Sequence, residues 1–358
     1  MTEQILQSFD VQGFQTNLID WYQANKRDLP WRHDQDPYKV WVSEIMLQQT
    51  QVATVIPYFQ RFIAKYPTLH DLAYADQQDV LKTWEGLGYY SRARHLQNAV
   101  REVVASYDGE VPDDPKALGS LKGIGPYTKG AILSIAFNKP QPAVDGNVMR
   151  VLSRVLKIED DIAQPKVKKQ FEHYADGIIS DKDPSSFNQG IMELGALVCT
   201  PKEPMCLFCP VQEYCRAFQE GMEQDLPVKS KAKKQKKVHY TVLLICNDND
   251  EYLIEKRPDD GLLANMWQFP MVPVDEIGKD HMDNWFQLEY GIDITLSAKQ
   301  GDLKHVFSHI IWQLEIVTAT TSRDQAADKR LRFVSRDMLD EYPFPVSHQK
   351  MMPYITSR

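Results

Sequence analysis

The sequence has few cysteines and no long apolar run. Its 358 residues include five cysteines, and no stretch approaches the roughly 18 uninterrupted apolar residues of a membrane helix. The N-terminus, MTEQILQSFD, lacks the basic region followed by an apolar run that marks a secretory signal. We therefore expect a cytoplasmic protein without membrane segments, whose cysteines are ligands or free thiols rather than disulfides.

An excess of basic residues is also lacking. The chain has 41 Lys and Arg against 49 Asp and Glu, a net charge of −8, which argues weakly against a nucleic-acid partner. A composition of 43% hydrophobic and 25% charged residues is typical of globular proteins. The length predicts two or three domains.

The chain reads as a helical region, a basic linker and a β-rich region. Apolar residues at helical spacing over 42–56 predict a helix that stops at Pro57, and a second apolar stripe follows Asp145, which is well placed to cap its start. Residues 219–237 contain a run of lysines and few apolar residues, so they predict a solvated linker. It is either a plain tether or also a contact to phosphates.

The last 120 residues have the pattern of an α+β domain. Residues 238–246 and 252–256 predict paired strands around the turn 247–250, and residues 306–312 and 331–334 predict further strands.

Four of the cysteines form a C-x6-C-x2-C-x5-C cluster: Cys199, Cys206, Cys209 and Cys215. All-cysteine ligation suits zinc or an iron–sulfur cluster, but zinc modules usually pair two C-x2-C knuckles and this spacing has one. The fifth, Cys246, ends an apolar run and is expected in a strand core. The spacing resembles the loop of the endonuclease III and MutY superfamily, which implies a 4Fe-4S cluster as cofactor.

A glycine-rich turn lies at Leu121–Thr128. Gly123 and Gly125 permit a tight turn that directs backbone N–H groups toward a phosphate, although an ordinary turn between helices has the same pattern. With Asp145 twenty residues further on and the cysteine loop downstream, the combination resembles the helix–hairpin–helix glycosylase signature. The resemblance implies that Gly123, Gly125 and Lys122 contact the DNA backbone. Lys122 departs from the family, which commonly has proline there.

Two carboxylates carry the predicted chemistry. Leu29–Pro30–Trp31 and Ser43–Thr50 closely resemble the MutY signature. Taken alone, Glu44 reads as a solvated acid in a first helical turn and Asp145 as a helix N-cap. The resemblance implies instead that Glu44 is the general acid that protonates adenine N7, and that Asp145 stabilises the oxocarbenium-like sugar. We expect burial to raise the pKa of Glu44.

The resemblance also assigns residues around these carboxylates. Tyr127 stands where bifunctional relatives have the lysine that forms a Schiff base, so we expect hydrolysis with little strand cleavage. Asn147 is expected near the catalytic water. The resemblance further implies an adenine pocket formed by Trp31, Arg32, Leu47 and Gln189. It implies that Gln49 and Tyr89 insert into the duplex, and that Thr50 and Leu87 contact the lesion base.

The C-terminal region resembles a Nudix fold without its catalytic box. Residues 252–258 and 266–270 match the opening of that fold, but the Arg-Glu-x-x-Glu-Glu core is absent from residues 283–291, so no nucleotide hydrolysis is expected. In MutY proteins this domain recognises 8-oxoguanine through a Phe-Ser-His loop, seen here as Phe307, Ser308 and His309. Without the resemblance, these would read as ordinary surface residues.

The sequence therefore predicts a multidomain protein that joins an all-α helix–hairpin–helix glycosylase with an iron–sulfur cluster loop to an α+β Nudix-like domain. The expected boundaries are 1–218 for the helical region (six-helix domain at about 30–137, cluster domain from 1–29 and 138–218), 219–237 for the linker and 238–358 for the Nudix-like domain.

The expected activity is that of a monomeric, monofunctional glycosylase in base excision repair. It would remove adenine from double-stranded DNA with 8-oxoguanine:adenine or guanine:adenine mispairs. One alternative is a lyase-type glycosylase for damaged pyrimidines, which Tyr127 and the C-terminal domain oppose. The other is a non-enzymatic iron–sulfur protein that binds DNA or acts in redox chemistry, for which Glu44 and Asp145 would be dispensable.

Overall fold

The computed structural model describes residues 2–231 and 234–355. The chain divides into two compact units: Met1–Tyr74 with His95–Lys231, and Ala75–Arg94 with Ala232–Arg358. They are called the first and second unit below. Among the described residues, no helix is both long and apolar enough to cross a membrane.

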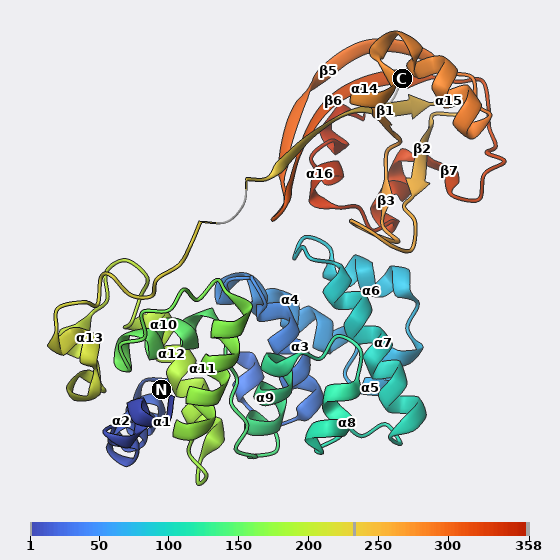
Figure 1. Cartoon of the computed structure of the whole chain (residues 1–358). Coiled ribbons are helices and arrows are strands. Elements are labelled where there is room, and N and C mark those ends of the chain that lie inside the picture. The colour runs from blue at the N-terminus through green and yellow to red at the C-terminus, as the bar shows by residue number, and fades with distance from the viewer. Residues whose placement is uncertain (1, 232–233, 356–358) are drawn as a thin grey trace. The chain divides into compact units, whose positions relative to one another are not determined.

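The first unit is built from helices (Figure 1). Its helices and 3-10 turns are α1 (Thr2–Gln7), α2 (Val11–Asn25), η1 (Pro30–Arg32), α3 (Pro37–Leu47), α4 (Val52–Lys65), α5 (Leu69–Tyr74), α8 (Pro115–Ser120), α9 (Pro126–Ile135), α10 (Gly146–Val155), α11 (Pro165–Ile178), α12 (Pro184–Leu197), η2 (Cys206–Phe208), η3 (Gln212–Tyr214) and α13 (Arg216–Gln219). Helix α7 (Ser91–Ser106) contributes residues to both units.

A single helix over residues 42–56 was expected, and this prediction is wrong. The chain breaks between α3 and α4, where Gln49 has φ 58°, and Pro57 lies inside α4 instead of ending it. A positive φ is uncommon for a residue with a side chain and interrupts a helix. The break leaves Gln49 exposed just beyond the end of α3.

Local sequence signals set the hairpin and the start of α10 as predicted. Gly123 has φ 93°, and a Cβ built there would come within 2.9 Å of the His95 Cβ, so the turn requires glycine. Asp145 caps α10, because its side chain accepts a hydrogen bond from the Val148 backbone N–H. The apolar face of α10 then joins a core with α2, α11 and α12.

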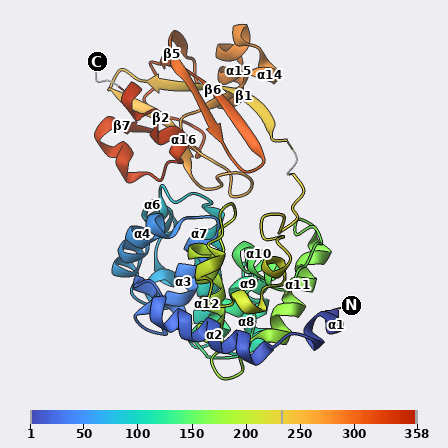
Figure 2. The same cartoon turned by 90° about the vertical axis from the view of Figure 1, so that its left-hand side faces the viewer.

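The second unit combines a mixed sheet with short helices (Figure 2). Its elements are α6 (Gln77–Trp84), β1 (Lys236–Cys246), β2 (Glu251–Lys256), β3 (Trp267–Gln268), β4 (Met271–Pro273), α14 (Val274–Ile277), η4 (Lys279–His281), α15 (Met282–Tyr290), β5 (Thr295–Val306), β6 (Ile310–Thr320), β7 (Leu331–Ser335), η5 (Arg336–Glu341), α16 (Val346–Gln349) and η6 (Met352–Tyr354).

The strands form one sheet in the order β3-β2-β1-β6-β5, with β4 paired to β1 and β7 paired to β2. Strands β1 and β6 are parallel over their full length, and the other pairs are antiparallel. The predicted pairing of β1 with β2 and the predicted strand at 331–334 are confirmed. The prediction of one strand through 306–312 is wrong, because the Phe307 N–H donates to the Ile310 carbonyl and closes a turn between β5 and β6.

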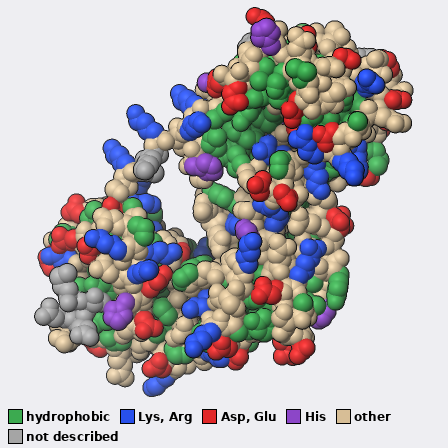
Figure 3. All heavy atoms as spheres, turned by 45° about the vertical axis from the view of Figure 1, so that its right-hand side comes forward, with side chains coloured by type: hydrophobic (Ala, Val, Ile, Leu, Met, Phe, Trp, Pro, Cys, Tyr) green, Lys and Arg blue, Asp and Glu red, His purple; other side chains and the backbone are tan. Residues whose placement is uncertain are grey.

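The segment between the two folded regions is held to the first unit at its start. The Val228 carbonyl accepts a hydrogen bond from the Ile162 N–H, and the Ser230 N–H donates to Asp161. Lys229, Lys231 and Lys234 of this segment are exposed, and basic side chains are visible along it in Figure 3.

Candidate active site

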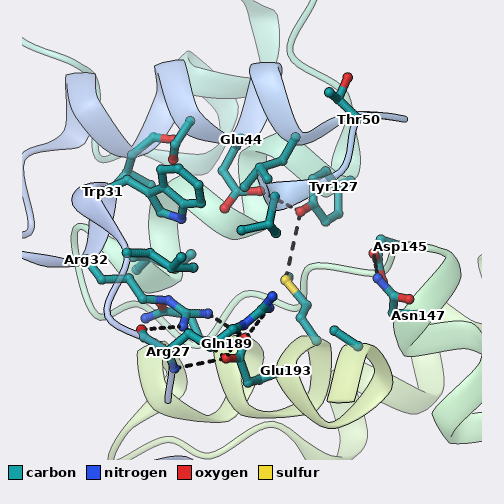
Figure 4. A pocket seen from close by; sticks show the side chains of 18 residues that line it. Arg27, Trp31, Arg32, Glu44, Thr50, Tyr127, Asp145, Asn147, Gln189 and Glu193 are labelled. Atoms are coloured by element: carbon teal, nitrogen blue, oxygen red, sulfur yellow. Dashed lines mark hydrogen bonds and ion pairs between the residues drawn. The ribbon is translucent and has the colours of Figure 1, made fainter. Parts of the chain in front are cut away.

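A cavity of 160 Å³ in the first unit brings together nine of the predicted residues. They come from η1, α3, the break after it, α9, the start of α10 and α12, and Figure 4 shows Trp31, Glu44, Tyr127 and Gln189 around one space. These nine are Trp31, Arg32, Glu44, Leu47, Thr50, Tyr127, Asp145, Asn147 and Gln189. Most of these residues lie on helices, which hold their backbone positions.

Glu44 lies at the cavity with 5% of its surface exposed. Burial raises its pKa to about 7, an effect that the nearby Asp145 strengthens and a hydrogen bond from Tyr127 opposes. The Tyr127 hydroxyl donates to Glu44 Oε2 at 2.5 Å. Burial also raises the pKa of Tyr127 well above its ordinary value, so the phenol keeps its proton and remains a donor. The site thus holds a carboxyl group that can carry a proton near neutral pH.

The second carboxylate, Asp145, accepts hydrogen bonds through both oxygens. Oδ1 accepts from the Val148 N–H at 2.7 Å, and Oδ2 accepts from Asn147 Nδ2 at 2.9 Å. Burial raises the pKa of Asp145, while these two bonds favour its charged form. The arrangement fits an anion beside a developing positive charge.

Asn147 is itself held by a guanidinium that reaches the cysteine loop. Arg150 donates to Asn147 Oδ1 at 2.9 Å through one nitrogen and to the Cys199 carbonyl at 2.8 Å through another. The amide orientation of Asn147 is therefore set, with its nitrogen toward Asp145.

Sequence reasoning missed a charged group on the same cavity. Glu193, 1% exposed, accepts hydrogen bonds from the side chains of Arg27 and Arg32. Although burial disfavours its charge, these bonds lower its pKa to about 2. Arg32 also donates to Gln189 Oε1 at 3.2 Å. A sequence signal existed: Gln189 and Glu193 are four residues apart on α12 and so share a helix face.

The predicted backbone-contact residues lie at the start of α9. Lys122, Gly123 and Gly125 are all exposed, and Gly125 is the N-cap of that ten-residue helix. Free N–H groups at such a terminus suit a phosphate.

The four predicted ligands Cys199, Cys206, Cys209 and Cys215 line one small cavity. Among the described residues, no group of three or more His, Cys, Asp or Glu converges as around a single metal ion. Four cysteine thiolates are the donor set that holds a 4Fe-4S cluster, so the residue types fit that group. The buried Arg154 adds a positive charge there and donates to Cys199 Sγ at 3.2 Å.

The predicted lesion-reading residues line a second cavity, which lies within the second unit and has a volume of 370 Å³. Phe307, Ser308 and His309 form the turn between β5 and β6, and Ser308 and His309 are exposed. Tyr89 lines the same cavity, with φ 49° and 44% of its surface exposed. Leu87 is buried and lines neither cavity.

The chain matches two families along its length. Residues 42–176 match the HhH-GPD superfamily of base excision DNA repair proteins, and residues 241–353 match the NUDIX domain. Among solved structures, a thermostable thymine-DNA glycosylase aligns with a TM-score of 0.53 and 27% identity over 59% of this chain and 97% of that one. A trapped endonuclease III–DNA covalent intermediate aligns with a TM-score of 0.51 and 25% identity over 62% of this chain and 99% of that one. Fold and site therefore define a helix–hairpin–helix base excision repair protein.

Relatives that match most of the chain narrow this class. The adenine DNA glycosylase of Rattus norvegicus is 38% identical over 84% of this chain and 69% of its own length. That of Buchnera aphidicola subsp. Schizaphis graminum is 38% identical over 72% of this chain and 74% of its own. The chain belongs to the adenine DNA glycosylase (MutY) family.

Proposed function

We propose that this enzyme hydrolyses the N-glycosidic bond of adenine mispaired with 8-oxoguanine or guanine. The observation that carries the proposal is a buried glutamate, Glu44, whose pKa of about 7 is matched to proton donation and which shares a cavity with Asp145. Adenine is a poor leaving group as an anion, so an acid that protonates it is the first requirement of the chemistry.

Glu44 acts as the general acid. Its Oε2 accepts the Tyr127 hydrogen bond, which leaves the other oxygen to hold the proton that passes to adenine N7. Tyr127 is a positioning residue, because it orients the carboxyl group and keeps its pKa from rising further. As the bond to C1′ breaks, adenine departs as a neutral base.

Asp145 stabilises the positive charge that develops on the deoxyribose. Its carboxylate is preorganised by the bonds from Val148 and Asn147, so no reorganisation is needed when the charge appears. Water then completes the hydrolysis at C1′. Because Tyr127 cannot form an imine with the sugar, the product is an abasic site with an intact strand.

Recognition of the opposite base belongs to the second cavity. Ser308 and His309 offer hydroxyl and imidazole groups to the altered edge of 8-oxoguanine. Tyr89 and Gln49 enter the duplex, and both are exposed residues with positive φ. Lys122, Gly123 and Gly125 bind the backbone, and the linker lysines can add phosphate contacts. The family resemblance also assigns Thr50 and Leu87 to the lesion base, but Thr50 lines the first cavity and Leu87 is buried, so neither belongs to the second cavity. Because the substrate is chromosomal DNA, we place this monomer in the cytoplasm, at the nucleoid.

The four cysteines of the loop would hold a 4Fe-4S cluster. The group would supply a rigid cross-link for a segment with little regular structure, and Arg154 would donate a hydrogen bond to one thiolate.

The activity is tested by single-turnover reactions on a duplex with one 8-oxoguanine:adenine pair, with and without alkali. We expect strand breaks only after alkali treatment, and none on a thymine-glycol duplex. Breaks without alkali, or activity on thymine glycol alone, would identify a lyase, and inactivity on every duplex would favour a non-enzymatic protein.

The cofactor is tested with a pair of cysteine variants. We expect Cys199→Ser to lose iron and the absorbance near 400 nm, whereas Cys246→Ser, in β1, keeps both. Zinc without iron in the purified protein would contradict the iron–sulfur assignment.

A further inference from the structure

Helix α6 carries a polar face that is bonded to the C-terminal part of the second unit. Gln78, Lys82 and Glu85 are spaced four and three residues apart, so they lie on the same side of α6. Glu85 is the C-cap of the helix. Gln78 uses both ends of its amide: Oε1 accepts from Trp267 Nε1 at 2.9 Å, and Nε2 donates to the Asn265 carbonyl at 3.1 Å.

A second set of contacts lies at the C-cap of the helix, Glu85. Glu85 Oε1 accepts from the Phe344 backbone N–H at 2.7 Å. Its other oxygen accepts from Lys82 at 2.7 Å, and Lys82 also donates to the Tyr342 carbonyl at 3.3 Å. Phe344 is 1% exposed, so its N–H would lose its partner in a buried place without Glu85. Removing this bond should therefore be costly in free energy, and the bond fixes the end of α6 against the backbone at Phe344.

The segment that follows α6 ends in the cavity of the lesion-reading loop. Gly86 and Gly88 have φ of 95° and 76°, and Tyr89 between this turn and α7 also has a positive φ. At its far end, Arg94 donates to the Asp259 carbonyl at 2.9 Å. Tyr89 is thus held between two anchors, and it lines the cavity together with Phe307 and Ser308.

We propose that Gln78, Lys82 and Glu85 form a latch that positions Tyr89 against the lesion-reading loop, so that insertion into the duplex and reading of the opposite base act as one rigid element. Gln78 and Glu85 are then positioning residues for lesion specificity, and neither lines the cavity that holds Glu44 and Asp145. The proposal rests on the proposed function, since it assumes that this loop reads 8-oxoguanine. A displacement of about 1 Å between two recognition groups is enough to lower a rate strongly.

The test compares two double variants of the full chain. The latch variant is Gln78→Ala with Glu85→Ala, and the matched control is Gln77→Ala with Asp79→Ala, one amide and one acid removed from the same helix. The first measurement is hydrogen exchange at the Phe344 amide, which we expect to be faster in the latch variant and unchanged in the control. Glu85→Gln, which keeps an acceptor oxygen for Phe344, should restore slow exchange.

The second measurement is single-turnover adenine excision opposite 8-oxoguanine and opposite guanine. We expect the latch variant to lose about tenfold in the ratio of the two rates, through the 8-oxoguanine duplex, while the rate opposite guanine stays within about threefold. Loss of stability alone would lower both rates together and overturn the proposal. Faster exchange with an unchanged ratio, or unchanged exchange, would also overturn it. A wild-type enzyme without preference for 8-oxoguanine would refute the proposed function itself, whatever the exchange shows.

Discussion

The two cavities of this protein differ in what their walls offer a nucleic acid. The cavity of the first unit measures 160 Å³ and contains buried ionisable groups that are held by hydrogen bonds, namely Glu44, Asp145 and Glu193 with its two arginines. The cavity of the second unit measures 370 Å³ and has an aromatic and apolar wall, with exposed Ser308 and His309 at the turn.

The difference follows from the two tasks. Breaking a bond requires protonation states that are set in advance, and burial is the means of shifting the pKa of a carboxyl group. Reading a base requires donors and acceptors that stay hydrated until the DNA arrives, which keeps them on a loop. Substitutions in the first cavity should therefore change the rate on every substrate, and substitutions in the second should change the ratio between substrates.

The largest effect is expected for Glu44→Gln. The variant cannot protonate adenine, so we expect excision to fall about 10³-fold opposite both 8-oxoguanine and guanine. Single-turnover rates measure this, with the exposed Glu102→Gln as control. If the excision rate fell opposite only one of the two bases, the assignment of catalysis to the first cavity and of base recognition to the second would be contradicted.

The same substitution should stabilise the fold at alkaline pH. Because burial raises the pKa of Glu44 from 4.5 to about 7, the folded wild type binds its proton more tightly than the unfolded chain, and its stability falls as pH rises between these values. Glu44→Gln lacks this loss, so at pH 8 its unfolding free energy should exceed that of wild type by on the order of 3 kcal/mol. Denaturant unfolding at pH 4 and pH 8 checks it: the gap should close at pH 4, and an equal gap at both values would exclude a raised pKa.

A smaller effect is expected in the second cavity. Ser308→Ala combined with His309→Ala removes two hydrogen-bonding groups, and at about 1 kcal/mol each the preference for 8-oxoguanine over guanine should fall about thirtyfold. The rate opposite guanine should stay nearly constant. Ser322→Ala, an exposed serine of the same unit, is the control. An unchanged preference would remove the loop from lesion reading.

The smallest effect is a displacement of the pH profile by Tyr127→Phe. Activity requires protonated Glu44, so it declines as pH rises above about 7. The hydrogen bond from Tyr127 lowers the pKa of Glu44, and its loss should move this decline to higher pH by about one unit. The control is Tyr38→Phe, which removes the hydroxyl of a buried tyrosine on α3 that bonds to the Tyr66 carbonyl. It should leave the profile unchanged. A shift to lower pH would contradict the assigned hydrogen bond.

Local sequence patterns were sufficient to predict several features of the fold and the candidate site. The cap at Asp145 and the turn at Gly123 depend on side chains and φ angles within a few residues, so the sequence displays them. The raised pKa of Glu44 and its cause, burial, were predicted from the resemblance, and the structure adds which elements bury the residue, namely α3, α9 and the start of α10.

Other features depend on distant partners or on weak local signals. The contact of Arg27 with Glu193 joins residues 166 positions apart, which no short motif reveals. The turn at 307–309 contains neither glycine nor proline, so its residues read as a continuous strand. The break at Gln49 likewise lacks a glycine, although Gln49 adopts φ 58°.

The bond between Glu85 and the Phe344 amide spans 259 residues of chain, and this has a consequence for biosynthesis. At a translation speed of about 5–20 residues per second, α6 leaves the ribosome tens of seconds before the strand and turn that complete its polar face. During that interval Gln78, Lys82 and Glu85 lack their partners from residues 265–344, although Lys82 and Glu85 can still pair with each other. The last step of maturation is then the closure of a long loop, so truncated chains should retain an adhesive patch on α6 that the finished protein covers with its own C-terminal residues.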